Sequence, residues 1–114
     1  MKHSYQEFLQ DILDAIAEIE LFIDGISFEE FQLNREKTLA VVKLLEIIGE
    51  AVKNIPEEKY ALYPDVPWRS ITGMRNILVH EYWQVDITVA WRTAIVFLPL
   101  LKAIIGEMLN QEIS

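Results

Sequence analysis

Three features that the sequence lacks narrow the class of protein. The 114 residues include no cysteine, which excludes a disulfide framework and a zinc site built on thiolates. The longest apolar run, from Ala94 to Leu101, is far shorter than the roughly 20 residues that span a bilayer. No basic segment followed by an apolar one opens the chain, so no secretory signal peptide is predicted. These absences favour a soluble, cytoplasmic protein without a membrane partner.

The chain also has few basic residues. The chain has 10 Lys and Arg residues against 18 Asp and Glu residues, and its formal net charge is −8. Affinity for nucleic acid depends largely on neutralisation of phosphates by Lys and Arg, so this balance argues against a general nucleic-acid binder. An RNA-directed function would need a local positive site, for which Arg69, Arg75 and Arg92 are the candidates. The acidity could equally serve a basic protein partner.

The size and the apolar pattern predict one all-α domain, residues 1–114. A chain of this length can bury a modest core of its own. Its apolar content of 52% is slightly above ordinary globular usage, which suggests a buried surface beyond the core of one monomer. We find no strand-like alternation, internal repeat or linker. The expected architecture is an antiparallel helical bundle with about four main helices and several short ones.

Capping signals mark where the first helices begin. Ser4 with Glu7 has the pattern of a capping box, for a helix that runs to about Asp24. Ser27 with Glu30 has the same pattern and predicts a short helical turn next in the chain. Apolar residues recur at intervals of three and four along the first helix, which predicts a face that packs into the core: Phe8, Ile12, Ala15, Ile16, Ile19 and Ile23.

A long helix is predicted from Arg35 to Asn54, with Asn34 as its N-cap. A glycine inside a helix costs up to about 1 kcal/mol relative to alanine, so we expect Gly49 to permit the close approach of another helix. Glu46 and Glu50 form an i,i+4 carboxylate pair, which could be a metal or acid–base site. Because no histidine accompanies them at ligand spacing, a solvated face or a partner for arginines is the favoured interpretation.

A further helix is predicted from about Trp68 to Glu81, after a loop that contains prolines. Pro67 suits the first turn of this helix, and Trp68 is expected to pack beneath it as a core anchor. From Arg75 to Tyr82 the chain carries a permanent cation, a carboxamide, an imidazole and a phenol within eight positions. No other stretch gathers such chemically capable groups.

Helical geometry would bring several of these groups together. At about 100° per residue, one face would hold Arg75, Asn76, Val79, His80 and Trp83, with Asn76 and His80 as an i,i+4 pair. Imidazole can act as a general base or acid near neutral pH, and the arginine fork suits phosphate. This is a minimal set for cutting RNA, in which the ribose 2′-OH is the nucleophile and no metal is required. The alternative is a surface arginine with a core or interface histidine. Trp83 could stack on a base or pack in a dimer or the core.

The last predicted helix starts at Asp86 as its N-cap and runs towards Asn110. Its apolar arc covers well over half of the circumference, and such a helix needs a partner on more than one side. One partner is the monomer core, and the other is expected to be a second chain or a protein partner. Pro99 should kink this helix or locally break its hydrogen bonding.

The motif Arg75-x4-His80-x-Tyr82, preceded by Pro67-Trp68-Arg69, resembles the HEPN superfamily and, within it, the HepT-like toxins. A bare R-x4-H would be weak, but the likeness extends over nearly the whole chain. Segments from each part of the sequence contribute to it: Phe8–Leu13, Ile26–Phe31, Leu45–Ala51, Tyr63–Trp68 and Val85–Asp86.

This resemblance implies an all-α homodimer that acts as a metal-independent RNase without a cofactor, with two R-x4-H motifs facing each other in one composite cleft. His80 would be the acid/base group, Arg75 the phosphate-stabilising group, and Asn76 the polar residue beside it. The implied partner is an MNT-type nucleotidyltransferase, the antitoxin, which would neutralise the toxin by transferring AMP to Tyr82. Glu81 would raise the pKa of His80 or repel RNA.

A non-catalytic interaction module is the alternative function. In that case the same region would pair with a nucleotidyltransferase and help to present or receive its substrate. The net charge of −8 and Glu81 favour this alternative. The set of Arg75, Asn76, His80 and Tyr82 favours the RNase.

Overall fold

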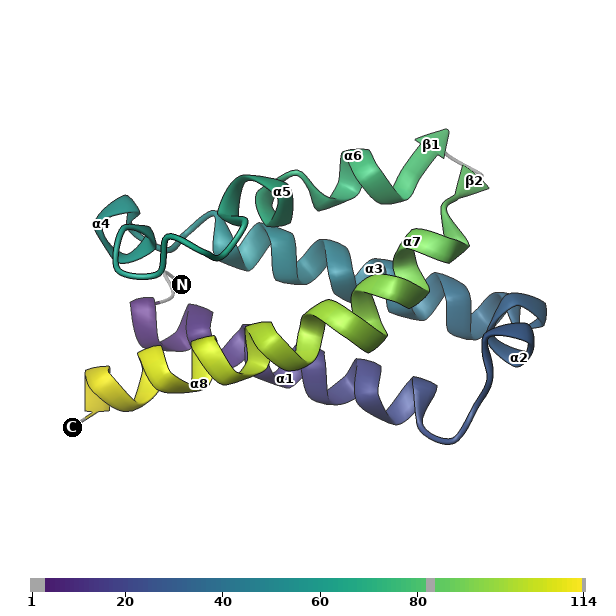
Figure 1. Ribbon diagram of the computed structural model, residues 1–114, viewed down its shortest axis with the longest axis horizontal. Helices are drawn as coiled ribbons and strands as arrows, with labels where there is room; N and C mark the ends of the chain where they lie inside the picture. The colour runs from purple at the N-terminus through teal and green to yellow at the C-terminus, as the bar shows by residue number, and fades with distance from the viewer. Residues whose placement is uncertain (1–3, 82–83, 114) are drawn as a thin grey trace.

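The structure is a computed structural model that describes residues 4–81 and 84–113, and its long helices run antiparallel along one axis (Figure 1). The N-terminal half contains α1 (Tyr5–Ile23), the short α2 (Phe28–Leu33) and α3 (Arg35–Val52). Helices α1 and α3 pack against each other along their lengths, and α2 turns the chain between them. The predicted all-α class is confirmed.

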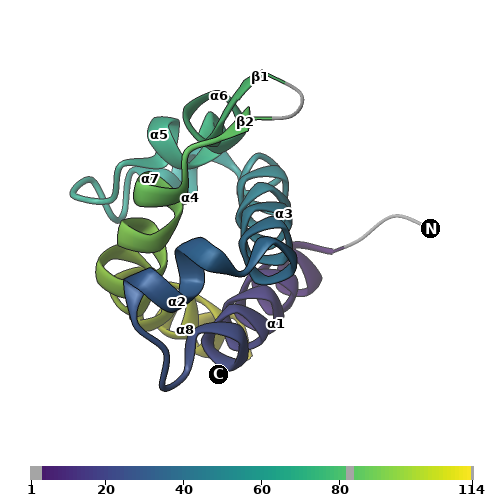
Figure 2. The ribbon, with the colours of Figure 1, turned by 90° about the vertical axis from the view of Figure 1, so that its right-hand side faces the viewer.

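The middle of the chain is a series of short elements (Figure 2). These elements are α4 (Glu57–Tyr60), α5 (Trp68–Thr72), α6 (Met74–Leu78), β1 (Val79–Glu81) and β2 (Gln84–Val85). Of these, α5 and α6 pack on α3. The two strands form an antiparallel hairpin beyond the end of α6.

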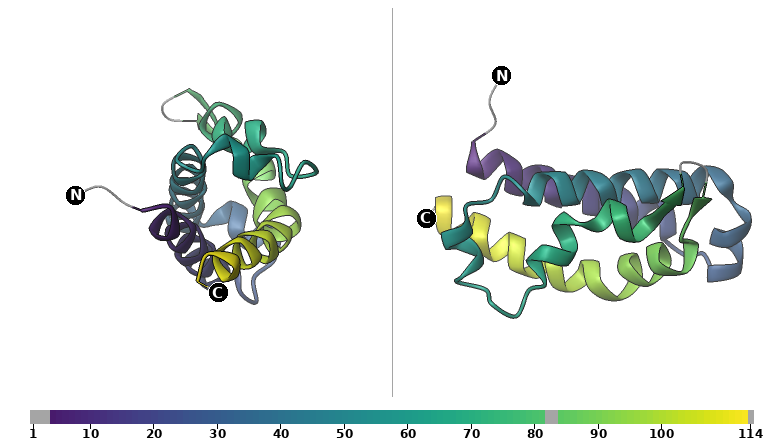
Figure 3. Two further views of the ribbon diagram at one scale, coloured as in Figure 1. Left: turned by 90° about the vertical axis from the view of Figure 1, so that its left-hand side faces the viewer. Right: turned by 90° about the horizontal axis from the view of Figure 1, so that it is seen from above.

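The C-terminal part is one continuous helical rod made of α7 (Ile87–Arg92), the π-helical η1 (Thr93–Phe97) and α8 (Leu98–Ile113). Figure 3 shows α1, α3, the α5–α6 segment and this rod around a common interior. By length and hydropathy alone, residues 87–112 could cross a membrane, a test that core helices of soluble proteins also pass. In this fold the rod packs on α1 and contributes six side chains to the core: Ala90, Ala94, Leu98, Leu101, Ile105 and Met108.

The predicted caps are present where the structure describes them. Ser27 and Glu30 form a full capping box, in which each side chain accepts the backbone N–H of the other at 3.1 and 3.2 Å. The Asn34 side chain caps α3 by accepting the N–H of Lys37 at 3.0 Å. Gly25 follows α1 with a φ of +72°, a left-handed conformation that glycine adopts without strain.

The expected disturbance at Pro99 takes the form of the π-helical stretch just before it. The N–H of Leu98 donates to the carbonyl of Thr93, five residues back instead of four. Pro99 has no N–H to donate, and in a regular helix its ring would clash with the carbonyl of Ile95. Ile95 lies inside the widened stretch, so the rod accommodates proline without ending.

The predicted helix from Trp68 to Glu81 is wrong in two respects. It is interrupted at Gly73, which separates α5 from α6, and it ends at Leu78. The chain then becomes extended, and the Leu78 carbonyl accepts the N–H of Asp86 at 2.6 Å across the base of the hairpin. The expectation that the chain has no strands is corrected with it.

Candidate active site

Arg75 is the second residue of α6, and its side chain is exposed. Within residues 4–81 and 84–113, no carboxylate forms an ion pair with it. The guanidinium therefore has its donors available for an external anion such as a phosphate, for which its planar fork is well suited.

Gly49 determines how closely the segment that carries Arg75 approaches α3. A Cβ atom built on Gly49 would lie 2.7 Å from the carbonyl oxygen of Ile71 and 3.3 Å from Cβ of Met74. The backbone between α5 and α6 thus rests directly on α3, where only a glycine fits. The predicted close approach is confirmed, and Arg75 follows Met74 directly, so its backbone is positioned by this contact.

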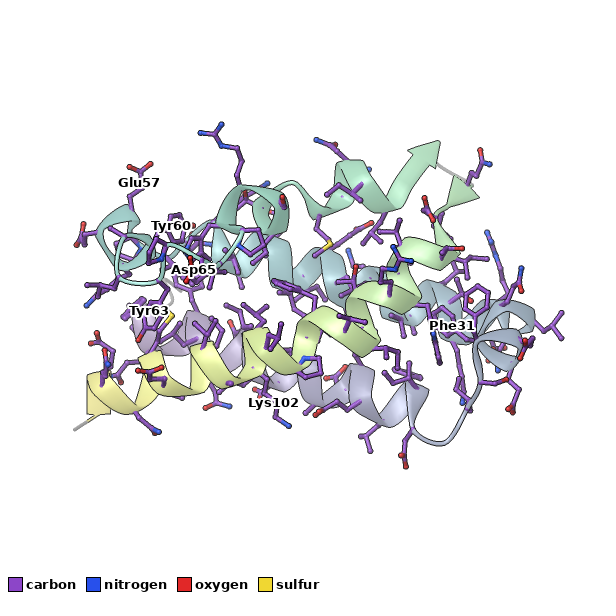
Figure 4. The ribbon with its side chains drawn as sticks, in the orientation of Figure 1. Phe31, Glu57, Tyr60, Tyr63, Asp65 and Lys102 are labelled. Atoms are coloured by element: carbon purple, nitrogen blue, oxygen red, sulfur yellow. The ribbon has the colours of Figure 1, made fainter. Side chains whose placement is uncertain are left out.

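Trp68 anchors the start of the same segment, as predicted. Its side chain is 7% exposed and its indole N–H donates to the Tyr63 carbonyl at 3.0 Å. Its ring stacks on Tyr60, with centroids 4.8 Å apart and planes inclined by 18°. The Tyr60 hydroxyl in turn donates to the carbonyl of Val52 at the end of α3 at 2.6 Å. Figure 4 shows Tyr60 and Tyr63 beside α4, at the end of the bundle from which α5 departs.

Two phenols in this part of the molecule have raised pKa values. Burial raises the pKa of Tyr5 to about 12, with further contributions from the negative charge of Glu112 and from Tyr63. Burial also raises the pKa of Tyr60, assisted by the charge of Glu57. Both phenols therefore remain protonated at neutral pH.

His80 lies in β1 and not on a helix. Val79 pairs with Val85 and Glu81 pairs with Gln84, so His80 is an extra residue on its strand, as in a β-bulge. Bulges change the direction of side chains and occur often beside active sites. The structure describes the backbone of His80 but not its side chain.

The prediction that Asn76 and His80 share one helical face is wrong, because the helix ends at Leu78 before it reaches His80. Asn76 is exposed on α6, next to Arg75. Tyr82 and Trp83, for which modification and base stacking are predicted, lie outside the described residues.

The base of the hairpin is tied to the last helical rod by Asp86. Its N–H donates to Leu78, and its carboxylate accepts the N–H of Val89 at 3.0 Å, which caps α7 as predicted. One residue thus closes the hairpin and starts the next helix. The position of the strand that carries His80 depends on both bonds.

A groove with a volume of about 650 Å³ runs between α1 and α3, and Arg75 is one of its lining residues. Its apolar lining includes Phe8, Leu44, Ile47 and Ala51. Five carboxylates also line it: Asp11, Asp14, Glu18, Glu46 and Glu50. This negative charge opposes an RNA backbone that would enter along the groove, so RNA is expected to reach Arg75 from another side.

The acids of α1 that line the groove carry a weak signal in the sequence. Asp11, Asp14 and Glu18 follow one another at intervals of three and four, which is the signal that they share one side of the helix. The sequence could not show that this side meets Glu46 and Glu50 of α3. Among the described residues, no three His, Asp or Glu side chains come together as a metal site.

The other two candidate cations are also exposed. Arg69 lies in α5, one helix before Arg75, and Arg92 is the last residue of α7. The three arginines therefore come from three separate short helices. The structure leaves all three accessible to solvent, as contacts with RNA would require.

Comparison with known proteins settles the family. The model of the family described as Ribonuclease HepT-like matches residues 12–108, which include Arg75, Asn76 and His80.

The chain belongs to the HepT-like ribonuclease family.

Relatives within this family cover most of the chain. A protein of Thermococcus cleftensis named "Probable ribonuclease HepT" is 45% identical over 102 residues, which are 90% of this chain and 93% of the relative. A protein of Methanocaldococcus jannaschii whose name describes it as an RNase is 41% identical, over 89% of this chain and 84% of the relative. No solved structure matches the chain. The resemblance to HepT-like proteins of the HEPN superfamily and the assignment to a ribonuclease family are thus confirmed.

The structure shows how the two residues of the R-x4-H motif are placed in this HepT-like chain. Arg75 of the R-x4-H motif is exposed, has no ion-pair partner among the described residues, and is held in place through the contact of Gly49 with Ile71 and Met74. His80 of the motif follows on a bulged strand. The motif thus spans a change from helix to strand at one end of the bundle.

Proposed function

We propose that this HepT-like chain is the toxin of a HEPN/MNT toxin–antitoxin system and acts in the cytoplasm as a metal-independent endoribonuclease. The observation that carries the proposal is the R-x4-H motif with its arginine exposed, unpaired within the described part of the chain and fixed by a backbone contact to α3. The membership of a ribonuclease family supports it.

The proposed reaction uses the RNA itself as the nucleophile. The imidazole of His80 takes the proton of a ribose 2′-OH, and the 2′-oxygen attacks the adjacent phosphorus. Arg75 stabilises the negative charge that develops on the phosphate oxygens. The bond from phosphorus to the 5′-oxygen breaks, and that oxygen leaves with a proton, which gives a 2′,3′-cyclic phosphate and a 5′-hydroxyl. Asn76, beside Arg75, offers further hydrogen bonds to the phosphate.

A second copy of the chain is the proposed source of the second proton transfer. One monomer contributes a single motif histidine, whereas the reaction needs a base at the 2′-oxygen and an acid at the 5′-oxygen. In a homodimer with facing motifs, His80 of one copy accepts a proton while His80 of the other donates one. This composite site is the reason to expect that activity requires the dimer.

The antitoxin in this proposal is a nucleotidyltransferase that modifies Tyr82. The phenol oxygen of Tyr82 attacks the α-phosphorus of ATP, pyrophosphate leaves, and the phenolic proton is released. The product carries a negative phosphodiester two positions after His80, where it would repel the phosphate of RNA.

The catalytic roles are tested with purified protein and an unstructured RNA. His80→Ala should abolish cleavage, and Arg75→Lys should reduce kcat by roughly 10²-fold or more because lysine lacks the planar fork. Chelation of divalent cations should leave the rate unchanged. Full activity of His80→Ala would overturn the mechanism, and an active monomer would overturn the composite site.

The switch is tested by intact mass of the protein produced with and without its nucleotidyltransferase. Mass added in AMP-sized steps, absent in Tyr82→Phe and accompanied by loss of RNase activity, is the expected result. Unmodified protein that is inactive on every RNA tested would contradict the toxin proposal.

A non-catalytic interaction module is the second candidate, and the acidic groove favours it. The five carboxylates beside Arg75 oppose RNA and would suit a basic surface of a protein partner. Expression in cells separates the two candidates. A nuclease should arrest growth unless its partner is co-expressed, whereas an interaction module should be tolerated alone.

A further inference from the structure

The last helical rod carries a second apolar face that the fold leaves uncovered. Ile95 is 44% exposed, Val96 61% and Leu100 62%, although all three are large apolar side chains. Pro99 and Ala103 are exposed beside them. We call these five residues the outer stripe. They lie on the side of η1 and α8 opposite to the buried residues that pack on α1.

A charged residue of opposite sign stands at each end of the outer stripe. Arg92 precedes it and Glu107 follows it, and both are exposed. Neither forms an ion pair within residues 4–81 and 84–113. Lys102, the cation beside the stripe, is already paired with Glu20 of α1 at 3.1 Å. Figure 4 shows Lys102 at the edge of α8 that borders α1.

The order of these residues makes the stripe complementary to itself when two copies run antiparallel. The midpoint between Val96 and Ala103 falls between Pro99 and Leu100, and Arg92 and Glu107 lie equally far from it, about 11 Å on either side at the helical rise. A two-fold axis at that midpoint places Arg92 opposite the partner's Glu107. It also places Val96 opposite the partner's Ala103, a large side chain against a small one.

We infer that the outer stripe is an isologous contact with a second copy of this chain, formed by antiparallel pairing of η1–α8. Charge selects this orientation, because a parallel pair would place Arg92 against Arg92 and Glu107 against Glu107. A two-fold contact of this kind is closed and uses the same surface on both copies. It buries the apolar side chains that the monomer exposes.

This contact is separate from Arg75 and His80 of the composite active site, and it gives Arg92 a partner in Glu107 in place of a contact with RNA. α8 packs on α1, whereas α5 and α6, which carry Arg69 and Arg75, pack on α3. Figures 1 and 3 show the α6–hairpin segment and α8 on different sides of the bundle. A chain with both two-fold contacts assembles into more than a dimer, and a closed tetramer is the simplest such assembly. The outer stripe itself does not depend on the proposed RNase activity.

Charge reversal tests the antiparallel pairing, with oligomeric mass measured by light scattering over a range of protein concentrations. Arg92→Glu and Glu107→Arg should each raise the dissociation constant of this contact by about tenfold or more, because two attractive pairs become repulsive. The double variant Arg92→Glu/Glu107→Arg should restore the assembly, since each pair is again of opposite sign. Failure of the double variant to recover would overturn the antiparallel pairing.

Leu100→Gln tests the apolar centre of the stripe, and Leu62→Gln is its matched control. Both leucines are 62% exposed, but Leu62 lies in the loop after α4. Leu100→Gln should weaken the assembly by at least about tenfold and leave RNase activity per chain unchanged. Leu62→Gln should change neither. At protein concentrations too low for assembly, thermal unfolding of both variants should match the parent, because neither position is buried within the monomer.

The masses also separate this inference from the proposed function. A parent tetramer that becomes a dimer in Leu100→Gln supports both two-fold contacts. A parent dimer that becomes a monomer supports the outer stripe but removes the separate composite-site dimer. A parent whose mass is insensitive to Leu100→Gln and to the charge reversals overturns the inference. So does a monomer that uses Leu100 only to bind phospholipid vesicles or a nucleotidyltransferase.

Discussion

Replacing Gly49 with alanine perturbs the candidate site without touching any of its functional groups. The added Cβ would lie 2.7 Å from the Ile71 carbonyl oxygen, about 0.7 Å short of the 3.4 Å at which ordinary contact begins. The Ile71 oxygen belongs to the backbone and cannot rotate away. Either α3 or the α5–α6 segment must therefore move by several tenths of an ångström, and Arg75 moves with it.

Two opposing contributions determine how Gly49→Ala changes the free energy of unfolding. Alanine improves helix propensity by up to about 1 kcal/mol, while overpacking of a buried contact costs about 1–3 kcal/mol. With the full gain in propensity, the net loss is up to about 2 kcal/mol, and a loss of about 1 kcal/mol lowers Tm by roughly 5 °C. A displacement approaching 1 Å at a reacting group can cost about 10²-fold in rate, so kcat for RNA cleavage should fall by about tenfold or more.

Gly106→Ala is the matched control for this substitution. Gly106 lies in α8, and a Cβ built there meets nothing within 4 Å. This variant should gain up to about 1 kcal/mol in stability and keep full activity. Thermal unfolding and steady-state cleavage are measured on both variants. If Gly49→Ala is as stable and as active as Gly106→Ala, the reasoning about the contact with Ile71 is refuted.

Three further predictions concern two helix caps and the half-buried phenol of Tyr5. Asp86→Ala should lose about 1 kcal/mol with the cap of α7 and should also reduce RNase activity, because the same residue closes the hairpin that carries His80. Ser27→Ala should lose about as much stability with its capping box, as measured by urea unfolding, and should keep its activity. The pKa of Tyr5, raised from 10.0 to about 12, means that the folded state keeps a proton that the unfolded state loses. Stability should therefore fall as the pH rises from about 10 towards 12, and Tm in Tyr5→Phe should fall less over that window.

The parts of the fold that were predicted correctly depend on local chemistry. The capping box at Ser27 and the cap at Asn34 involve only residues a few positions apart. The role of Gly49 was also predicted, because a glycine inside an apolar helix indicates that another segment of the chain packs very close to it. The sequence did not reveal that its neighbour would be the backbone of Ile71.

The end of the motif helix was predicted wrongly because a distant contact decides it. Apolar residues at helical spacing, such as Met74 and Leu78, extended the predicted helix to Glu81. The helix ends where the Leu78 carbonyl accepts the N–H of Asp86 across the hairpin. No local sequence pattern predicts that hydrogen bond. Val79 and Val85, which pair in the hairpin, favour extended structure, and this was the signal available.

The candidate site also has one part that the sequence predicted and one part that it did not. The residues of the motif could be identified from the sequence. The exposure of Arg75 agrees with the role that the resemblance implies. The acidic groove beside it was not predicted, because it forms only when α1 and α3 come together. The electrostatic surroundings of a site are thus a property of the packed bundle, and a motif does not encode them.

The π-helical stretch makes the last rod a helix with two phases. Before it, Trp91 meets Phe31 and Phe28 at ring-centroid distances of 5.1 and 5.9 Å. After it, the core face continues from Leu98. A hydrogen bond that spans five residues holds one residue more than a regular turn, so deleting a single residue between Thr93 and Phe97 would let the rod close into an ordinary α-helix. The two ends would keep their relative phase in that deletion variant. If the stretch instead became an ordinary α-helix with no residue removed, the two ends would rotate against each other by about 100°. The rod could then seat either Trp91 against α2 or Leu98 against α1, but not both.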